Sequence, residues 1–88
     1  MTVYSVQLGS VNNVDFNERD KNIWKVVANF AEARSVCREY IRDNDLGGGN
    51  WTGGTIRDAH NRVVGYVSYN GRVWEWDGKS IKKEIVLA

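Results

Sequence analysis

Residues 63–87 read VVGYVSYNGRVWEWDGKSIKKEIVL, and two dipeptides, Asn70-Gly71 and Asp77-Gly78, interrupt this stretch. Asn-Gly and Asp-Gly readily adopt the positive φ angles of the type I′ turn, which closes two-residue β-hairpin loops. The apolar runs that they separate are Val63–Tyr69, Arg72–Trp76 and Ser80–Leu87. The sequence from Gly53 to Leu87 therefore predicts a three-stranded antiparallel meander.

Two-residue loops would also fix how these three strands pair. In that register Val67 lies opposite Trp74, and Trp74 lies opposite Ile81. One face of the meander then carries apolar side chains that need a cover, namely Val67, Trp74, Trp76 and Ile81. The other face is mixed and would meet water or a partner, with Val64, Tyr66, Ser68, Val73, Glu75 and Lys82.

Three segments precede the helix. Val3–Leu8 alternates between apolar and polar residues and predicts a first strand. Gly9–Asn22 is rich in Asn and Asp and predicts a loop. Ile23–Ala28 contains Trp and Val, which favour extended structure, so we expect a second short strand there, with the approach to the helix as the alternative.

Asn29–Asn44 is the best helical segment of the chain. Asn29 can accept a hydrogen bond from the first helical turn, and Glu32 follows at the spacing of a capping box. Asn44 and Gly47 supply the stop signal. Apolar residues recur at helical spacing and form a stripe that would cover the meander: Phe30, Ala33, Val36, Cys37, Tyr40 and Ile41.

These elements predict an α+β fold for a single domain spanning residues 1–88. We expect one α-helix packed on an antiparallel sheet of four to five strands, in the order β-(β)-α-β-β-β. The expected core comprises Tyr4, Val6, Leu8, Phe30, Ala33, Val36, Cys37, Tyr40, Ile41, Ile56, Val67, Trp74 and Ile81.

The composition of the chain excludes several classes of protein. A net charge of +1 argues against a strongly basic protein that coats nucleic acid and against an acidic mimic of DNA. The sequence has no apolar run long enough for a membrane span and no secretion signal. Cys37 is the single cysteine, so no internal disulfide can form. We therefore expect a cytoplasmic protein.

Arg34, Arg38 and Arg42 recur on the polar side of the expected helix. This row is either a solvated helix face or a docking row for phosphates or a partner's carboxylates. Acidic residues such as Glu39 and Asp43 accompany the row and favour the solvated face.

Residues 46–54 read LGGGNWTGG and form a glycine-rich connector. A phosphate-binding loop would follow a strand, open a helix and end in Lys-Ser/Thr, whereas this connector follows the helix and contains no lysine. Trp51 either folds back on the core as a lid or stays exposed as a contact residue.

Residues for catalysis are sparse. A thiol nucleophile would need Cys37 beside a base, and His60, the only histidine, lies in the turn Asp58–Arg62. One histidine and one cysteine cannot build a zinc site. We therefore expect neither an enzyme nor a cofactor.

Gly65-Tyr66-Val67-Ser68-Tyr69 resembles the end of the longer signature of the RNA-recognition-motif family, and Val3–Leu8 resembles the shorter one. The resemblance implies that Tyr4 and Tyr66 stack on bases of single-stranded nucleic acid. The chain departs from the family because only the Asn70-Gly71 hairpin stands where a second helix is required. The small residue between the two aromatics of the longer signature is also replaced.

A second resemblance covers the chain from Ala31 onward. Ala31-Glu32-Ala33-Arg34, then residues 53–58 (GGTIRD), Val63-Val64 and residues 70–74 (NGRVW) resemble the β-α-β-β-β layout of small bacteriophage and mobile-element proteins, including some anti-CRISPR proteins. This resemblance implies a protein that occupies a surface of a larger host complex without catalysis.

The sequence thus predicts a small non-enzymatic protein that binds a larger protein or nucleoprotein complex stoichiometrically, as a phage-encoded inhibitor would. The alternative is a single-stranded nucleic-acid-binding module, and the oligomeric state stays open. Arginine and aromatic side chains near strand ends and loops are the expected binding residues: Trp51, Arg57, Arg62, Tyr66 and Arg72.

Overall fold

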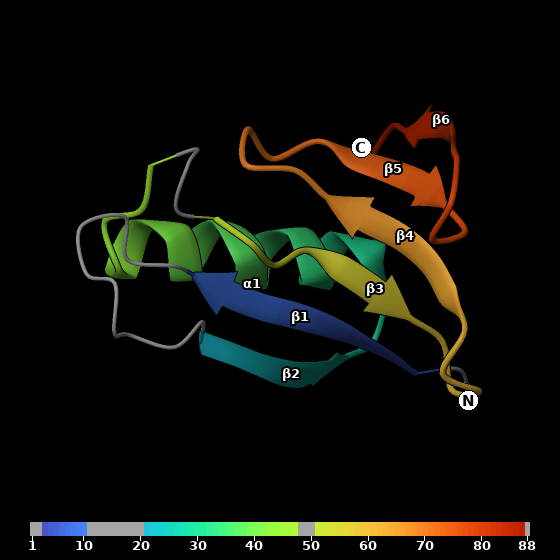
Figure 1. The fold of residues 1–88 in the computed structure, drawn as a ribbon, viewed down its shortest axis with the longest axis horizontal. Helices are drawn as coiled ribbons and strands as arrows, with labels where there is room; N and C mark the ends of the chain where they lie inside the picture. Colours follow the sequence, from blue (N-terminus) through green and yellow to red (C-terminus); the bar gives the residue numbers. More distant parts are fainter. Residues whose placement is uncertain (1–2, 11–20, 48–50, 88) are drawn as a thin grey trace.

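The computed structural model describes residues 3–10, 21–47 and 51–87, which form a six-stranded antiparallel sheet with one helix on one face (Figure 1). The elements are β1 (Tyr4–Ser10), β2 (Lys21–Val27), α1 (Phe30–Asp43), β3 (Thr55–Arg57), β4 (Val63–Val67), β5 (Val73–Trp76) and β6 (Ile81–Ile85). Their order across the sheet is β2-β1-β3-β4-β5-β6. In this part of the chain no helix is long and apolar enough to cross a membrane.

The predicted fold class is confirmed. The described residues form six strands rather than four to five, because β2, optional in the predicted layout, is present and β3 adds a short strand. The predicted loop Gly9–Asn22 is shorter than expected, since β1 extends to Ser10 and β2 begins at Lys21. Its remaining residues, 11–20, and residues 48–50 of the glycine-rich connector lie outside the described part.

Helix α1 begins and ends where the sequence predicts. The Oδ1 atom of Asn29 accepts a hydrogen bond from the backbone N–H of Glu32 at 2.8 Å. The Glu32 carboxylate accepts one from the backbone N–H of Ala28 at 2.6 Å, so the first turn is capped from both directions. At the other end Asn44 is the C-cap, and Asp45 rather than Gly47 takes the left-handed conformation, with φ 52°.

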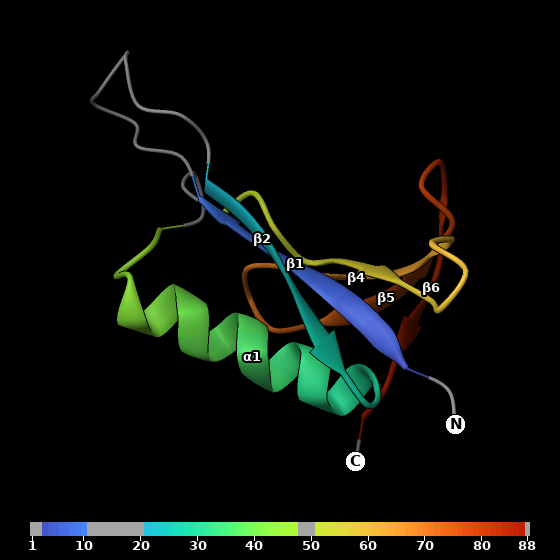
Figure 2. The ribbon, with the colours of Figure 1, turned by 90° about the horizontal axis from the view of Figure 1, so that it is seen from below.

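Figure 2 shows α1 lying along one face of the sheet, and the core fills the space between them. Most of the predicted core residues are buried there or pack against it. The buried apolar side chains are Val6, Leu8, Val27, Ala33, Cys37, Trp51, Ile56, Val67 and Val73.

The predicted pairing of β4 with β5 is wrong by one residue. Val67 lies opposite Val73, and Tyr66 lies opposite Trp74. Trp74 in turn lies opposite Glu84 of β6, not opposite Ile81. A shift of one residue moves every side chain of a strand to the other face of the sheet.

The difference between the predicted and the observed register arises in the turn before β5. Gly71 has the predicted positive φ, 85°, whereas Asn70 has no positive φ, and a type I′ turn requires both. The loop instead contains three residues, Tyr69–Gly71, and the backbone N–H of Ser68 donates to the carbonyl of Arg72 at 2.9 Å. Three-residue hairpin loops with a glycine in the left-handed region are a common alternative to the two-residue loop.

The second turn is also longer than predicted. Gly78 has the expected positive φ, 93°, but Trp76 pairs with Ile81, which leaves residues 77–80 in the loop. The Asp77 carboxylate accepts hydrogen bonds from the backbone N–H groups of Lys79 and Ser80, both at 2.8 Å. These bonds stabilise a four-residue loop in place of the predicted two-residue Asp-Gly loop.

Two predicted core residues therefore lie elsewhere. Val73, 1% exposed, faces the helix, whereas Ile81 is 58% exposed at the edge of the sheet. Trp74 and Trp76 fall on the face that α1 does not cover. The prediction that Trp74 is a core residue, and that the helix covers the face carrying both tryptophans, is therefore wrong.

Candidate binding surface

The face of the sheet opposite α1 has no second layer within the described residues (Figure 2). Strand register and ring contacts place Trp24, Arg57, Tyr66, Trp74 and Trp76 on this face, which we name the open face. It carries three of the four tryptophans of the chain. Large aromatic surfaces gathered on an uncovered sheet are uncommon in monomeric proteins unless they bind something.

At one side of the open face, Arg57 of β3 reaches over β1 toward Trp24 of β2. The guanidinium carbon of Arg57 lies 4.4 Å from the centroid of the Trp24 ring, within the range of a cation–π interaction. Trp24 remains 41% exposed. The buried Nε atom of Arg57 has no hydrogen-bond partner among the described residues.

The centre of the open face is a cluster of three aromatic side chains. The rings of Tyr66 and Trp76 meet edge to face, with centroids 5.8 Å apart. Tyr66 also lies opposite Trp74, whose Nε1–H donates to the Ser68 hydroxyl at 3.4 Å. Burial raises the pKa of the Tyr66 phenol, so this hydroxyl stays neutral and can donate or accept a hydrogen bond.

Arg72 stands at the far end of the cluster. Its side chain is 58% exposed, and its Nε lies 4.0 Å from a carboxylate oxygen of Glu84. An exposed ion pair at this distance contributes little to stability. The guanidinium is therefore available to a partner's carboxylate or carbonyl groups.

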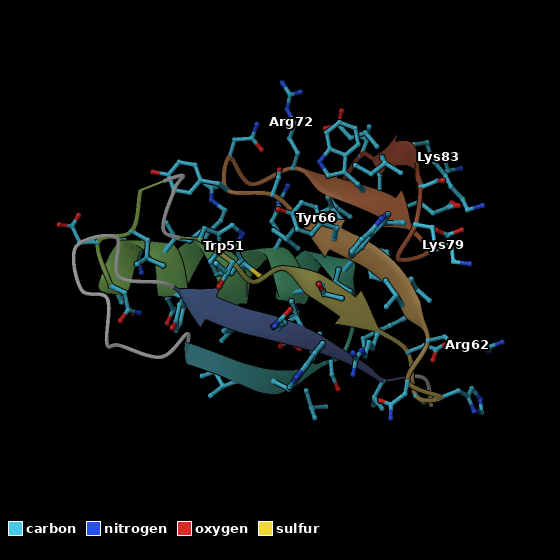
Figure 3. The ribbon with its side chains drawn as sticks, viewed as in Figure 1. Trp51, Arg62, Tyr66, Arg72, Lys79 and Lys83 are labelled. Carbon is cyan, nitrogen blue, oxygen red and sulfur yellow. The ribbon has the colours of Figure 1, made fainter. Side chains whose placement is uncertain are left out.

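The structure brings together three of the five predicted binding residues. Arg57, Tyr66 and Arg72 lie on the open face. Arg62 does not join them, because it belongs to the turn after β3, where its Nε lies 3.2 Å from the Asp58 carboxylate. Figure 3 shows Arg72 at the top of the molecule, with Tyr66 below it, and Arg62 apart from both at the lower right.

The prediction that Trp51 is an exposed contact residue is wrong, and the alternative that it closes the core is confirmed. Trp51 is 7% exposed, and its ring packs against Tyr40 with centroids 6.0 Å apart. Its Nε1–H donates to the carbonyl of Val67 at 3.2 Å. This hydrogen bond satisfies the one polar group that the indole buries.

Residues 51–54 can enter the core because the glycines after Trp51 allow close backbone contact. The segment lies between β1 and β4: the N–H of Gly54 donates to the carbonyl of Gln7 at 2.7 Å, and the N–H of Val67 donates to the carbonyl of Gly54 at 2.8 Å. A Cβ atom on Gly54 would lie 2.1 Å from the Val67 carbonyl oxygen, so any side chain here would force the backbone to shift.

The tyrosines of the RNA-recognition-motif resemblance lie on opposite faces of the sheet. Tyr4 faces the helix and meets Phe30 edge to face, with ring centroids 5.2 Å apart, whereas Tyr66 lies on the open face. Tyr4 shares its side of β1 with Val6 and Leu8, which explains its orientation. The pair of stacking tyrosines implied by that resemblance is therefore not formed.

The side chains considered for catalysis are either buried in the core or hydrogen-bonded within a turn. Burial raises the pKa of the Cys37 thiol to about 12. The Asp58 carboxylate accepts hydrogen bonds from the backbone N–H groups of Arg62 and His60. These bonds, the one from Arg62 most of all, lower the pKa of Asp58. Among the described residues, no three His, Cys, Asp or Glu side chains gather in a group that could hold a metal.

Sequence reasoning missed Trp24, Trp74 and Trp76 as binding candidates. A two-residue loop at Asn70-Gly71 predicts that the last two lie on the face covered by the helix. A three-residue loop at Tyr69–Gly71 would have placed them on the open face.

Comparison with known proteins does not assign a function to this chain. No family model matches the chain, and the searches of curated proteins and of solved structures found no match.

Proposed function

We propose that this chain is a small non-enzymatic protein that binds a larger protein or nucleoprotein complex through the open face. The observation that carries the proposal is the composition of this face, with Trp24, Tyr66 and Trp76 next to Arg57 and Arg72. Trp, Tyr and Arg are the residue types that dominate the energetics of protein interfaces.

Charge favours a protein partner over nucleic acid. One of the two arginines of the open face, Arg72, stands beside Glu84, and the whole chain carries a net charge of +1. Tight binding to a phosphate backbone draws on the release of many counterions, which needs more cations than this face offers. A protein that presents apolar side chains with one or two carboxylates matches the face better.

The inhibitor form of this proposal is supported by the layout of the chain. The small phage proteins that the layout resembles act by occupying a surface of a larger complex, and their mode of action is part of the proposal.

A single-stranded nucleic-acid-binding module is the second candidate. The observation that favours it is the spread of aromatic rings over β2, β4 and β5, since bases stack on exposed rings irrespective of sequence. Trp24, Tyr66 and Trp76 would then take the stacking role that the sequence assigned to Tyr4 and Tyr66.

The test compares two charge-reversal variants as bait in affinity capture from bacterial lysate. One carries Arg57→Glu with Arg72→Glu on the open face, and the matched control carries Arg34→Glu with Arg38→Glu on α1. We expect a partner captured in equal molar amount by the wild-type protein and by the helix variant, but not by the open-face variant. Circular dichroism verifies folding, and Arg72→Glu alone replaces the pair if the double variant unfolds.

Binding by the open-face variant and loss of binding in the folded helix variant would refute the surface assignment. A fluorescent single-stranded oligonucleotide separates the two partner classes. Binding that weakens at least about tenfold between low and physiological salt, and that disappears in the open-face variant, would replace the protein proposal with the nucleic-acid one.

A further inference from the structure

Arg57 is a cation of the open face that has no ionic partner among the described residues. Arg62 and Arg72 do stand beside carboxylates, with Nε 3.2 Å from Asp58 and 4.0 Å from Glu84, respectively. No described carboxylate lies within ion-pair distance of Arg57, and its Nε atom is buried without a hydrogen-bond partner. A charged group that is partly withdrawn from water needs such partners, so Arg57 gains from an anion that another molecule supplies.

The strand residues around Arg57 are neutral on this face. In the row of paired residues that crosses β3 at Arg57, the neighbours are Ser5 and Val26 on one side and Val63 on the other. Of the two carboxylates in the described strands, one lies on the helix side, and the other, Glu84, is separated from β3 by β4 and β5. Arg57 therefore presents its charge on a neutral surface, which is complementary to a negative charge on a partner.

The Trp24 ring orients this cation. The guanidinium carbon of Arg57 lies 4.4 Å from the ring centroid, so the planar group is attracted to the ring face. The terminal nitrogens of Arg57 make no hydrogen bond to the described residues and, unlike Nε, are not buried. They form the edge of a planar fork that matches the two oxygens of a carboxylate. Because the ring contact already restricts the side chain, less conformational entropy is lost when such an anion binds.

We propose that Arg57 is the seat of one carboxylate group of the partner protein, an Asp or Glu side chain, and that Trp24 is the residue that positions the guanidinium. This inference rests on the proposed function and names what the partner presents at this point of the open face. The exposed side chains next to the seat are apolar, with Trp24 41% and Val26 67% exposed. The matching carboxylate therefore stands beside apolar residues in the partner.

A carboxylate suits this seat better than the phosphates of a nucleic acid. A phosphate backbone repeats its charge at short intervals and is bound by several cations in series. The other arginine of the open face, Arg72, lies beyond β4 from Arg57 and stands beside Glu84, whose charge repels phosphate. One guanidinium at the end of an otherwise neutral row matches a single carboxylate.

Titration with phenylacetate tests the seat without any partner, because this probe joins one carboxylate to an apolar ring. The readout is the Trp24 indole N–H signal in a ¹⁵N–¹H correlation spectrum, with the signal of buried Trp51 as internal reference. We expect a saturable shift of the Trp24 signal in the millimolar range usual for so small a ligand. Phenylacetamide, the neutral analogue, and sodium chloride at the same concentration should leave this signal in place.

Two substitutions of Arg57 separate the charge from the fork. Arg57→Gln should abolish the shift, and Arg57→Lys, which keeps the charge, should raise the dissociation constant of phenylacetate at least about threefold. Arg38→Gln on α1 is the matched control and should leave this constant unchanged. Circular dichroism verifies that every variant is folded.

Two substitutions of Trp24 test its positioning role, with the backbone amide signal of Arg57 as the readout. Trp24→Phe keeps a ring face for the guanidinium and should change the dissociation constant by less than about twofold, whereas Trp24→Ala should raise it at least about threefold. Equal constants for the folded alanine and phenylalanine variants would overturn the positioning role.

The seat itself is overturned if the Trp24 signal does not move with phenylacetate, or moves equally with phenylacetamide or in folded Arg57→Gln. Tighter binding of inorganic phosphate than of phenylacetate at Arg57 would replace the carboxylate with a phosphate. The capture experiment fails independently of this one. Probe binding without a captured partner would refute the proposed function alone, and capture that depends on the open face without probe binding would refute the seat alone.

Discussion

Val67 of β4 lies directly opposite Val73 of β5, and both side chains are buried beneath α1, at 0% and 1% exposed. This pair fixes the faces of the last three strands, because the neighbouring residues Tyr66 and Trp74 must then point away from the helix. The position of the binding surface therefore depends on the Val67–Val73 pair.

Truncation of Val73 tests this register. We expect Val73→Ala to lower the free energy of unfolding by about 2 kcal/mol, since it removes two buried methyl groups and leaves a cavity. Val86→Ala is the same chemical change at an 86% exposed position and should cost less than about 0.5 kcal/mol. Urea denaturation of both variants measures the difference, and equal losses would show that Val73 does not face the core.

A second pair of variants separates the stability cost of a steric clash from the stability cost of backbone strain. Gly54 and Gly78 both have positive φ, 107° and 93°. A Cβ atom on Gly54 would meet the Val67 carbonyl oxygen at 2.1 Å, whereas on Gly78 the nearest neighbour, in the Val63 side chain, is 3.8 Å away. We expect Gly78→Ala to cost about 1 kcal/mol through strain alone and Gly54→Ala about 3 kcal/mol or more.

The measurement is again the free energy of unfolding from urea denaturation. Equal costs for Gly54→Ala and Gly78→Ala would mean that residues 51–54 do not lie between β1 and β4 as described.

The sequence predicts the parts of the fold that local chemistry determines. Asn29 and Glu32 cap the helix as expected, and the alternation in Val3–Leu8 correctly orients Val6 and Leu8 toward the core. The positive φ angles of Gly71 and Gly78 were also predictable, because those dipeptides favour them.

The register of β4 and β5 could not be predicted from local sequence in the same way. Whether Asn70-Gly71 closes a two-residue or a three-residue loop depends on the packing of Val73 under the helix and on the Asn70 side chain, which accepts a hydrogen bond from the N–H of Arg72 at 3.3 Å. Trp51 was ambiguous for a related reason. Its burial depends on Tyr40 and on the Val67 carbonyl, both distant in sequence.

Cys37 is predicted to be inert toward thiol reagents in the folded protein. Its side chain is 0% exposed, and burial raises its pKa to about 12, so almost no thiolate exists near neutral pH. Reaction with a chromogenic disulfide at pH 8 should be slow for the native protein and complete within the mixing time in urea. Rapid reaction without denaturant would show that α1 does not pack Cys37 against the sheet.

Acid should weaken the turn between β5 and β6. Backbone hydrogen bonds from Ser80 and Lys79 lower the pKa of Asp77 in the folded state. The stability that this carboxylate contributes is present above the pKa of Asp in the unfolded chain, about 3.9, and is lost as pH falls through the lower folded value. Asp77→Ala should therefore lower Tm at neutral pH and reduce the further loss of Tm below about pH 4. An unchanged acid dependence would contradict this role.

The most direct test of the open face uses the four tryptophan indole N–H signals in a ¹⁵N–¹H correlation spectrum during titration with the captured partner. Three of these residues, Trp24, Trp74 and Trp76, lie on the open face, and buried Trp51 is an internal control. We predict that the three signals shift or broaden while the Trp51 signal stays in place. Unchanged signals for all three, with shifts confined to backbone amides of α1, would contradict the assignment of the open face as the binding surface.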